Sequence, residues 1–185
     1  MDSGANSYQR FLQGDYSAVA EIIRDYKDGL IYYVNSIVGN IHTAEDVAED
    51  TFLKLMIKRP KDKGGSSFKT WLYTIARNEA LNRLRKEKRF ADKSAELNVE
   101  NAADTEDLER GYIKKEQRLA VHRAMRGLKA EYRQVLCLVY FEDFSIKDAA
   151  AVMHKSVHAA ETLVYRARLA LKAELLKEGF TYEEL

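Results

Sequence analysis

The sequence predicts an all-α protein made of two small helical domains joined by a flexible acidic linker. One proline and nine glycines in 185 residues leave few points at which a helix must stop, and such a composition disfavours a many-turned β fold. Apolar residues recur at helical spacing through most of the chain. From about residue 91 to residue 110 this periodicity is lost and the chain turns acidic. We therefore expect domains at 1–90 and 114–180, with a linker at 91–113.

The first domain opens with a long helical pattern. Apolar side chains share one face from Val19 to Ile37, and Gly39 with the asparagine after it supplies residues that commonly end a helix. A second pattern starts where Thr43 and Asp46 resemble a capping box, and the chain's one proline ends it. The next seven residues, KDKGGSS, predict a loop.

A third helix is predicted from about Phe68 to about Phe90, with aromatic residues concentrated at its start and basic residues at its end. Small and aliphatic residues make its expected buried side: Leu72, Ile75, Ala76, Ala80 and Leu84. Polar and amphipathic residues make its expected exposed sides: Lys69, Tyr73, Arg77 and Arg83.

Helical patterns return in the second domain. The apolar run around Cys137 is long enough for a buried helix, in which a buried thiol is expected. Ser145 begins a short helix, and a turn leads to Ser156, which can cap a longer helix reaching about Lys177. A short helix, a turn and a longer helix form a helix-turn-helix, which places its second helix in the DNA major groove. An ordinary helical hairpin would give a similar pattern.

Basic and acidic residues are segregated along the chain, although the net charge is only +1. Residues 83–89, RLRKEKR, hold five basic residues and one acidic residue, whereas residues 94–109 hold six acidic residues and no basic one. Basic side chains neutralise phosphates and aromatic rings stack on unpaired bases, so the third helix suits DNA that is being opened. Asn78 can hydrogen-bond a base edge. Alternatively, Trp71 is a core residue and the basic end complements its own helix dipole.

Other classes of function find little support. The single cysteine excludes an internal disulfide. Of the four histidines only His154 and His158 are spaced for one helical face, and the predicted turn separates them, which disfavours a metal pair. There is no phosphate-binding glycine loop and no nucleophile elbow, so we expect neither an enzyme nor a cofactor. The start of the chain is not a signal peptide, and no apolar run approaches the roughly 20 residues that span a bilayer. We expect a cytoplasmic protein without direct membrane insertion.

Two segments resemble the extracytoplasmic-function (ECF) sigma factors of bacterial RNA polymerase. TAEDVAEDTFLKLM at residues 43–56 resembles their core-polymerase-binding helix. FKTWLYTIARNEALNRLRKEKR at residues 68–89 resembles the segment that melts the promoter and reads its minus-ten element. The acidic linker and the helix-turn-helix follow in the same order as in that family. Without the resemblance, the acidic second helix reads as a docking surface or as a charged solvent face.

The resemblance implies a role for each matched segment. The β′ clamp helices of the core polymerase would contact Asp46, Val47, Glu49, Asp50, Phe52 and Leu53. The minus-ten strand would lie near Lys69, Thr70, Trp71, Tyr73, Arg77, Asn78, Arg83 and Arg85. The minus-thirty-five element would be read by Ser156, His158, Glu161, Thr162, Tyr165, Arg166 and Arg168.

Further expectations follow from the same resemblance. The loop at 61–67 would help to hold a flipped-out base, the linker would run toward the RNA exit channel, and the second domain would grip the β flap. The remaining partner would be an anti-sigma factor, often membrane-anchored in this family.

The recognition half departs from the family pattern. The turn has His154 where the family commonly has glycine, although histidine tolerates positive φ better than most residues. Lys155 stands where an apolar residue is usual, Glu161 where a lysine is common, and Leu163 where an arginine is common. Glu161 would repel phosphate, or it would read a cytosine amino group and alter the sequence preference.

Two rival functions remain open at this point. One is a helix-turn-helix regulator that works without the core polymerase, against which the docking and melting segments argue. The other is a sigma mimic that titrates an anti-sigma factor without binding DNA. The altered recognition helix favours the mimic, whereas the basic block at 83–89 argues against it.

Overall fold

The computed structural model describes residues 3–60, 66–93 and 120–180, and within these ranges the chain forms helices and turns with no strand. The predicted all-α class is confirmed. The helices are α1 (Ser3–Leu12), α2 (Ser17–Val38), α3 (Ile41–Lys58), α4 (Phe68–Lys93), α6 (Ala130–Leu136), the π-helix η1 (Cys137–Phe141), α7 (Ile146–Val152) and α8 (Val157–Lys177). Residues 120–126 are also helical. Most of the predicted linker, and the loop residues 61–65, lie outside the described residues.

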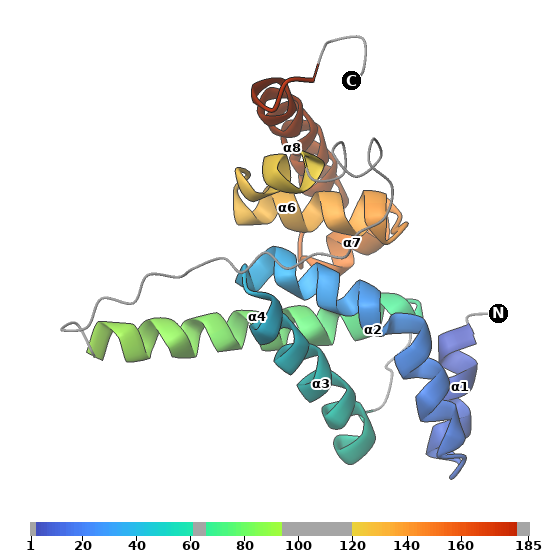
Figure 1. Cartoon of the computed structure of the whole chain (residues 1–185). Helices are drawn as coiled ribbons and strands as arrows, with labels where there is room; N and C mark the ends of the chain where they lie inside the picture. Colours follow the sequence, from blue (N-terminus) through green and yellow to red (C-terminus); the bar gives the residue numbers. More distant parts are fainter. Residues whose placement is uncertain (1–2, 61–65, 94–119, 181–185) are drawn as a thin grey trace.

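Helices α1 to α4 form the N-terminal half, in which α2 packs against α1, α3 and α4 (Figure 1). The sequence patterns did not predict α1. Its Tyr8 and Phe11 are almost fully buried, and the Tyr8 ring lies 5.3 Å from the Trp71 ring and 5.6 Å from the Phe68 ring. The start of α4 is therefore held against α1 by a cluster of aromatic rings.

The junction of α2 and α3 uses different caps from those expected. Gly39 ends α2 with a left-handed φ of 74°, as its position after the apolar pattern predicts. Helix α3 then starts at Ile41, because the side chain of Asn40 accepts a 2.9 Å hydrogen bond from the backbone N–H of Thr43. The prediction that Thr43 caps this helix is wrong, since Asn40 is the cap and Thr43 already lies inside the helix.

The C-terminal half contains the predicted helix-turn-helix. The side chain of Ser145 caps α7, and that of Ser156 caps α8. Between the helices His154 adopts a φ of 54°, so it occupies the left-handed conformation expected at this turn. Cys137 is fully buried where α6 passes into η1, and burial raises the pKa of its thiol well above the ordinary value.

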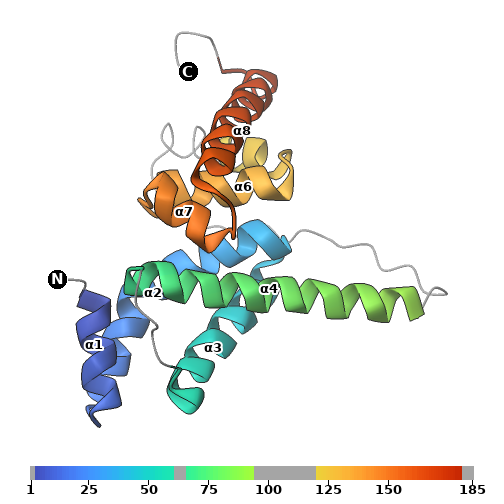
Figure 2. The same ribbon diagram turned by 180° about the vertical axis from the view of Figure 1, so that it is seen from behind.

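The two halves pack against each other. Helix α7 lies on the first turns of α4, and α6 with η1 lies on α2, while the second half of α4 extends beyond the other helices (Figure 2). One hydrophobic core runs through both halves. Tyr73 belongs to this core and is 1% exposed. The prediction of an exposed Tyr73 is wrong because a helix of the other half covers that face of α4.

Candidate polymerase and nucleic-acid interfaces

The predicted polymerase-binding residues of α3 fall into two groups. Asp46, Glu49, Asp50 and Leu53 are exposed. Val47 and Phe52 are 3% and 6% exposed, so they pack into the core beneath that surface. Beside them lies an open groove of about 300 Å³, lined by Ile23, Lys27, Ala48, Glu49, Phe52, Leu53 and Met56. The exposed part of α3 is thus an acidic ridge along an apolar groove.

Ion pairs tie α3 to α4. Lys54 of α3 pairs with Glu79 of α4, and the Asp46 carboxylate lies 3.8 Å from the Arg83 guanidinium. Arg83 also pairs with Glu87 one turn further along α4, at 3.0 Å. The first two contacts join α3 to the middle of α4, and the third lies within α4 itself.

One face of α4 is covered by the C-terminal half. Lys69, Tyr73 and Arg77 follow one another at four-residue spacing, and Thr70 lies beside them. The Thr70 hydroxyl donates a 3.3 Å hydrogen bond to Asp148, and the Arg77 guanidinium donates one of 3.3 Å to the side-chain oxygen of Gln134.

Glu142, which follows η1, makes the central contact of this covered face. Its carboxylate accepts a hydrogen bond from the Tyr73 hydroxyl and lies 3.3 Å from the Lys69 ammonium group. The ammonium also donates to the backbone carbonyl of Glu142 and lies 4.9 Å from the centre of the Phe144 ring. Burial, together with the hydrogen bond to Glu142, raises the pKa of Tyr73, so its hydroxyl stays protonated and donates.

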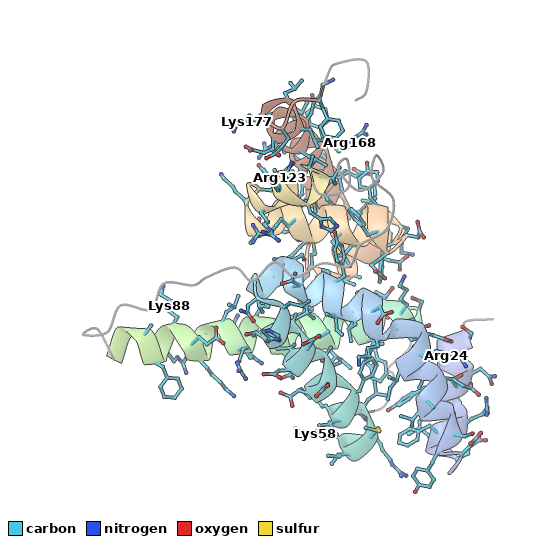
Figure 3. All side chains as sticks on the ribbon, in the orientation of Figure 1. Arg24, Lys58, Lys88, Arg123, Arg168 and Lys177 are labelled. Carbon is cyan, nitrogen blue, oxygen red and sulfur yellow. The ribbon has the colours of Figure 1, made fainter. Side chains whose placement is uncertain are left out.

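Other predicted minus-ten residues remain accessible. Trp71 is half-buried among rings, which confirms that part of it belongs to the core. Asn78, Arg83 and Arg85 are exposed. Lys88 lies on the half of α4 that projects beyond the other helices (Figure 3). The predicted minus-ten residues therefore fall into two groups: those covered by the C-terminal half and those exposed toward the basic end of α4.

The predicted minus-thirty-five residues share the outer side of α8. Ser156, His158, Glu161, Tyr165, Arg166 and Arg168 are exposed, and Thr162 is partly exposed. The ring nitrogen Nδ1 of His158 lies 3.8 Å from the Glu161 carboxylate. Leu163 is only 9% exposed and packs into the core, so it has no part in this surface. Arg168 lies far from α4 in Figure 3, so the two proposed DNA surfaces stand apart.

Sequence reasoning missed several residues of the interface between the halves, among them Gly29, Gln134, Glu142 and Phe144. Of these, only Gly29 could have been suspected from the sequence, since glycine is unusual in the middle of a long helix. In the ranges that the structure describes, no group of His, Cys, Asp and Glu side chains is arranged to hold a metal ion. The same ranges contain no helix long and apolar enough to cross a membrane.

Comparison with known protein families identifies the class of protein to which the chain belongs. The family description Sigma-70 region 2 matches residues 22–90, and Sigma-70, region 4 matches residues 118–171. These two regions, in this order, define a sigma-70-type transcription initiation factor.

Comparison with individual proteins identifies the family within that class. The RNA polymerase sigma-H factor of Pseudomonas aeruginosa is 30% identical over 176 residues, which cover 90% of this chain and 91% of the relative. The ECF RNA polymerase sigma factor SigW of Bacillus subtilis is 28% identical over 176 residues, covering 88% and 91%. The chain belongs to the ECF sigma factors, and it directs RNA polymerase to promoters.

A solved structure supports the same assignment. The sigma factor RpoE of Bartonella quintana, in complex with the anti-sigma factor NepR, superposes with a TM-score of 0.68 at 28% identity. The match covers 85% of this chain and 96% of RpoE. The rival interpretation as a stand-alone helix-turn-helix regulator does not account for region 2.

Proposed function

We propose that three surfaces divide the work of this sigma factor. The exposed acidic ridge of α3, with its groove, docks on the core polymerase through Asp46, Glu49, Asp50 and Leu53. Helix α4 captures the separated strands of the minus-ten element. The outer side of α8 reads the minus-thirty-five element. The polymerase performs all covalent chemistry, so this chain contributes binding and no catalytic step.

The exposed basic end of α4 is the observation that carries the proposal. Arg85 and Lys88 are exposed there, and Lys88 lies on the part of α4 that projects beyond the other helices (Figure 3). Cations so placed can neutralise phosphates along a strand, while the half-exposed ring of Trp71 offers a stacking surface toward the start of the helix. Val47 and Phe52 are almost fully buried and support the docking ridge from within, and Phe52 also lines the groove.

An anti-sigma factor is the proposed regulator. RpoE of Bartonella quintana was solved with the anti-sigma factor NepR, and this chain has the same fold over most of its length. The apolar groove beside Leu53 is lined by few charges, so it suits an apolar segment of such a partner. We place the chain in the cytoplasm, where the polymerase acts.

Assembly of a ternary complex tests the proposal. Purified chain, core polymerase and a fork-junction DNA are mixed and separated on a native gel. We expect a complex containing all three, and we expect Trp71→Ala to slow open-complex formation more than it weakens duplex binding. A chain that acts as a mimic would give no ternary complex, and equal losses in the two DNA assays would contradict the strand-capture role of Trp71.

A further inference from the structure

Glu142 of the C-terminal half occupies a small notch on the N-terminal half. The notch is formed by Gly29 in the middle of α2 and by Lys69 and Tyr73 on α4. It supplies an ammonium group, a phenolic hydroxyl and a gap in the side-chain layer. The side chain of Glu142 is only 12% exposed there, so its charge is removed from water and neutralised by these groups.

Gly29 makes the notch accessible. A Cβ atom at this position would lie 2.6 Å from both carboxylate oxygens of Glu142 and 2.6 Å from the Tyr73 hydroxyl. Any other residue would therefore push the carboxylate out. Glycine in the interior of a helix destabilises that helix relative to alanine. The close approach of Glu142 gives a physical reason for glycine at this point of α2.

We propose that the notch of Gly29, Lys69 and Tyr73 is an anion-binding site, occupied by the Glu142 carboxylate in the free chain and by a DNA backbone phosphate once the halves separate. Glu142 then acts as a latch that holds the two halves together. The part of this proposal that concerns DNA rests on the proposed function of α4.

The covered face cannot bind Glu142 and DNA together. The Lys69 ammonium group is enclosed by the Glu142 carboxylate and carbonyl and by the Phe144 ring. Thr70 and Arg77 hydrogen-bond Asp148 and Gln134 in the same interface. A phosphate that approaches this face must displace the carboxylate, because both anions require the same donors. DNA binding and latch opening are thus linked, and each favours the other.

Two isosteric substitutions test the latch. Glu142→Gln removes the charge in the notch, and Asp143→Asn removes an equal charge from the next residue, which is exposed. Asparagine tolerates the left-handed φ of 54° at position 143, so the control keeps the turn. Small-angle scattering of the free full-length chain measures its radius of gyration. Fluorescence anisotropy with a labelled random-sequence single-stranded 15-mer measures DNA affinity without polymerase.

We expect Glu142→Gln to increase the radius of gyration and to lower the dissociation constant for the single strand about three- to tenfold, since the binding-competent open state becomes more populated. Asp143→Asn should change neither. Gly29→Ala displaces the carboxylate from the other side and should also increase the radius of gyration. Its methyl group fills the notch, however, so it should tighten DNA binding less than Glu142→Gln does. In combination with Glu142→Gln it should add little further opening, because the carboxylate that it displaces is already gone.

The outcomes separate the latch from the proposed function. Unchanged dimensions in both Glu142→Gln and Gly29→Ala, with far-UV circular dichroism showing intact helices, would overturn the latch. Equal expansion in Asp143→Asn would also overturn it, because general charge repulsion would then be the cause. Expansion without tighter DNA binding would support the latch and overturn both the phosphate site and the DNA role of this face of α4.

Discussion

Single residues on α3 differ sharply in surroundings although they are neighbours in the chain. Leu53 is 46% exposed beside the groove, whereas Phe52 is 6% exposed and packs into the core. We expect Leu53→Ala to weaken binding to the core polymerase about five- to tenfold without loss of stability, because an exposed apolar anchor is truncated. Phe52→Ala should instead lower the free energy of unfolding by about 3–4 kcal/mol.

Fluorescence titration with core polymerase and urea unfolding of the free chain distinguish the two effects. Ile57, exposed on the same helix but absent from the groove lining, provides the matched control. If Ile57→Ala weakened polymerase binding as much as Leu53→Ala, the groove would not be the docking surface.

The chain's one cysteine gives a second prediction at this scale. Cys137 has no exposed surface, and burial raises the pKa of its thiol. At pH 8 the folded chain should therefore react with a thiol reagent about a hundredfold more slowly than the chain in denaturant, because the thiolate is the reactive form. Raising the pH to 9 should restore little of the difference. Fast labelling of the folded chain would contradict the packing around η1.

At the scale of whole helices, the capping residue determines where α3 begins. Asn40, and not Thr43, caps α3, by accepting a hydrogen bond from the backbone N–H of Thr43. We expect Asn40→Ala to cost about 1 kcal/mol of stability, whereas Thr43→Ala should cost nothing measurable. Thermal unfolding checks the difference, since about 1 kcal/mol corresponds to about 2–4 °C in a chain of this size. A larger loss for Thr43→Ala would reverse the assignment of the cap.

Local chemistry explains which elements the sequence predicted well. Ser145 and Ser156 each cap a helix with their own side chain, so the helix-turn-helix was predictable from a few neighbouring residues. Helix α1 was missed because only two of its four buried residues, Tyr8 and Phe11, are large and apolar, while Gly4 and Ser7 complete the buried face. Apolar spacing reports burial within one helix, but it does not identify the partner that buries it.

The candidate site shows the same limit more clearly. Tyr73 lies beside Leu72 on α4, and helical spacing alone assigns it to a more exposed side. It is buried because Phe144 of the C-terminal half packs against its ring, and Glu142, 69 residues further along the chain, accepts its hydrogen bond. No local pattern predicts a contact over such a separation. By contrast, Arg83 is exposed as expected, although it lies near Asp46 of α3.

The molecule as a whole has one core rather than two. Buried residues form a continuous cluster from Tyr8 in α1 to Ala167 in α8, and Phe144 joins the halves by packing 5.0 Å from the Tyr73 ring. Residues in a shared core lose their packing together, so the halves should unfold together. We expect calorimetry of the free chain to show a single transition.

Loosening the contact between the halves should separate their unfolding. Phe144→Ala removes the ring that packs on Tyr73, and we expect it to give two transitions in place of one. Leu175→Ala is the matched control, because it removes a buried side chain from the C-terminal half alone and should lower the midpoint of a single transition. Two transitions in the unmodified chain would mean that the halves fold independently. In the proposed role of α4, DNA can meet its whole surface only when α7 leaves it, so the stability of this contact should set how much of the free protein is ready to bind a promoter.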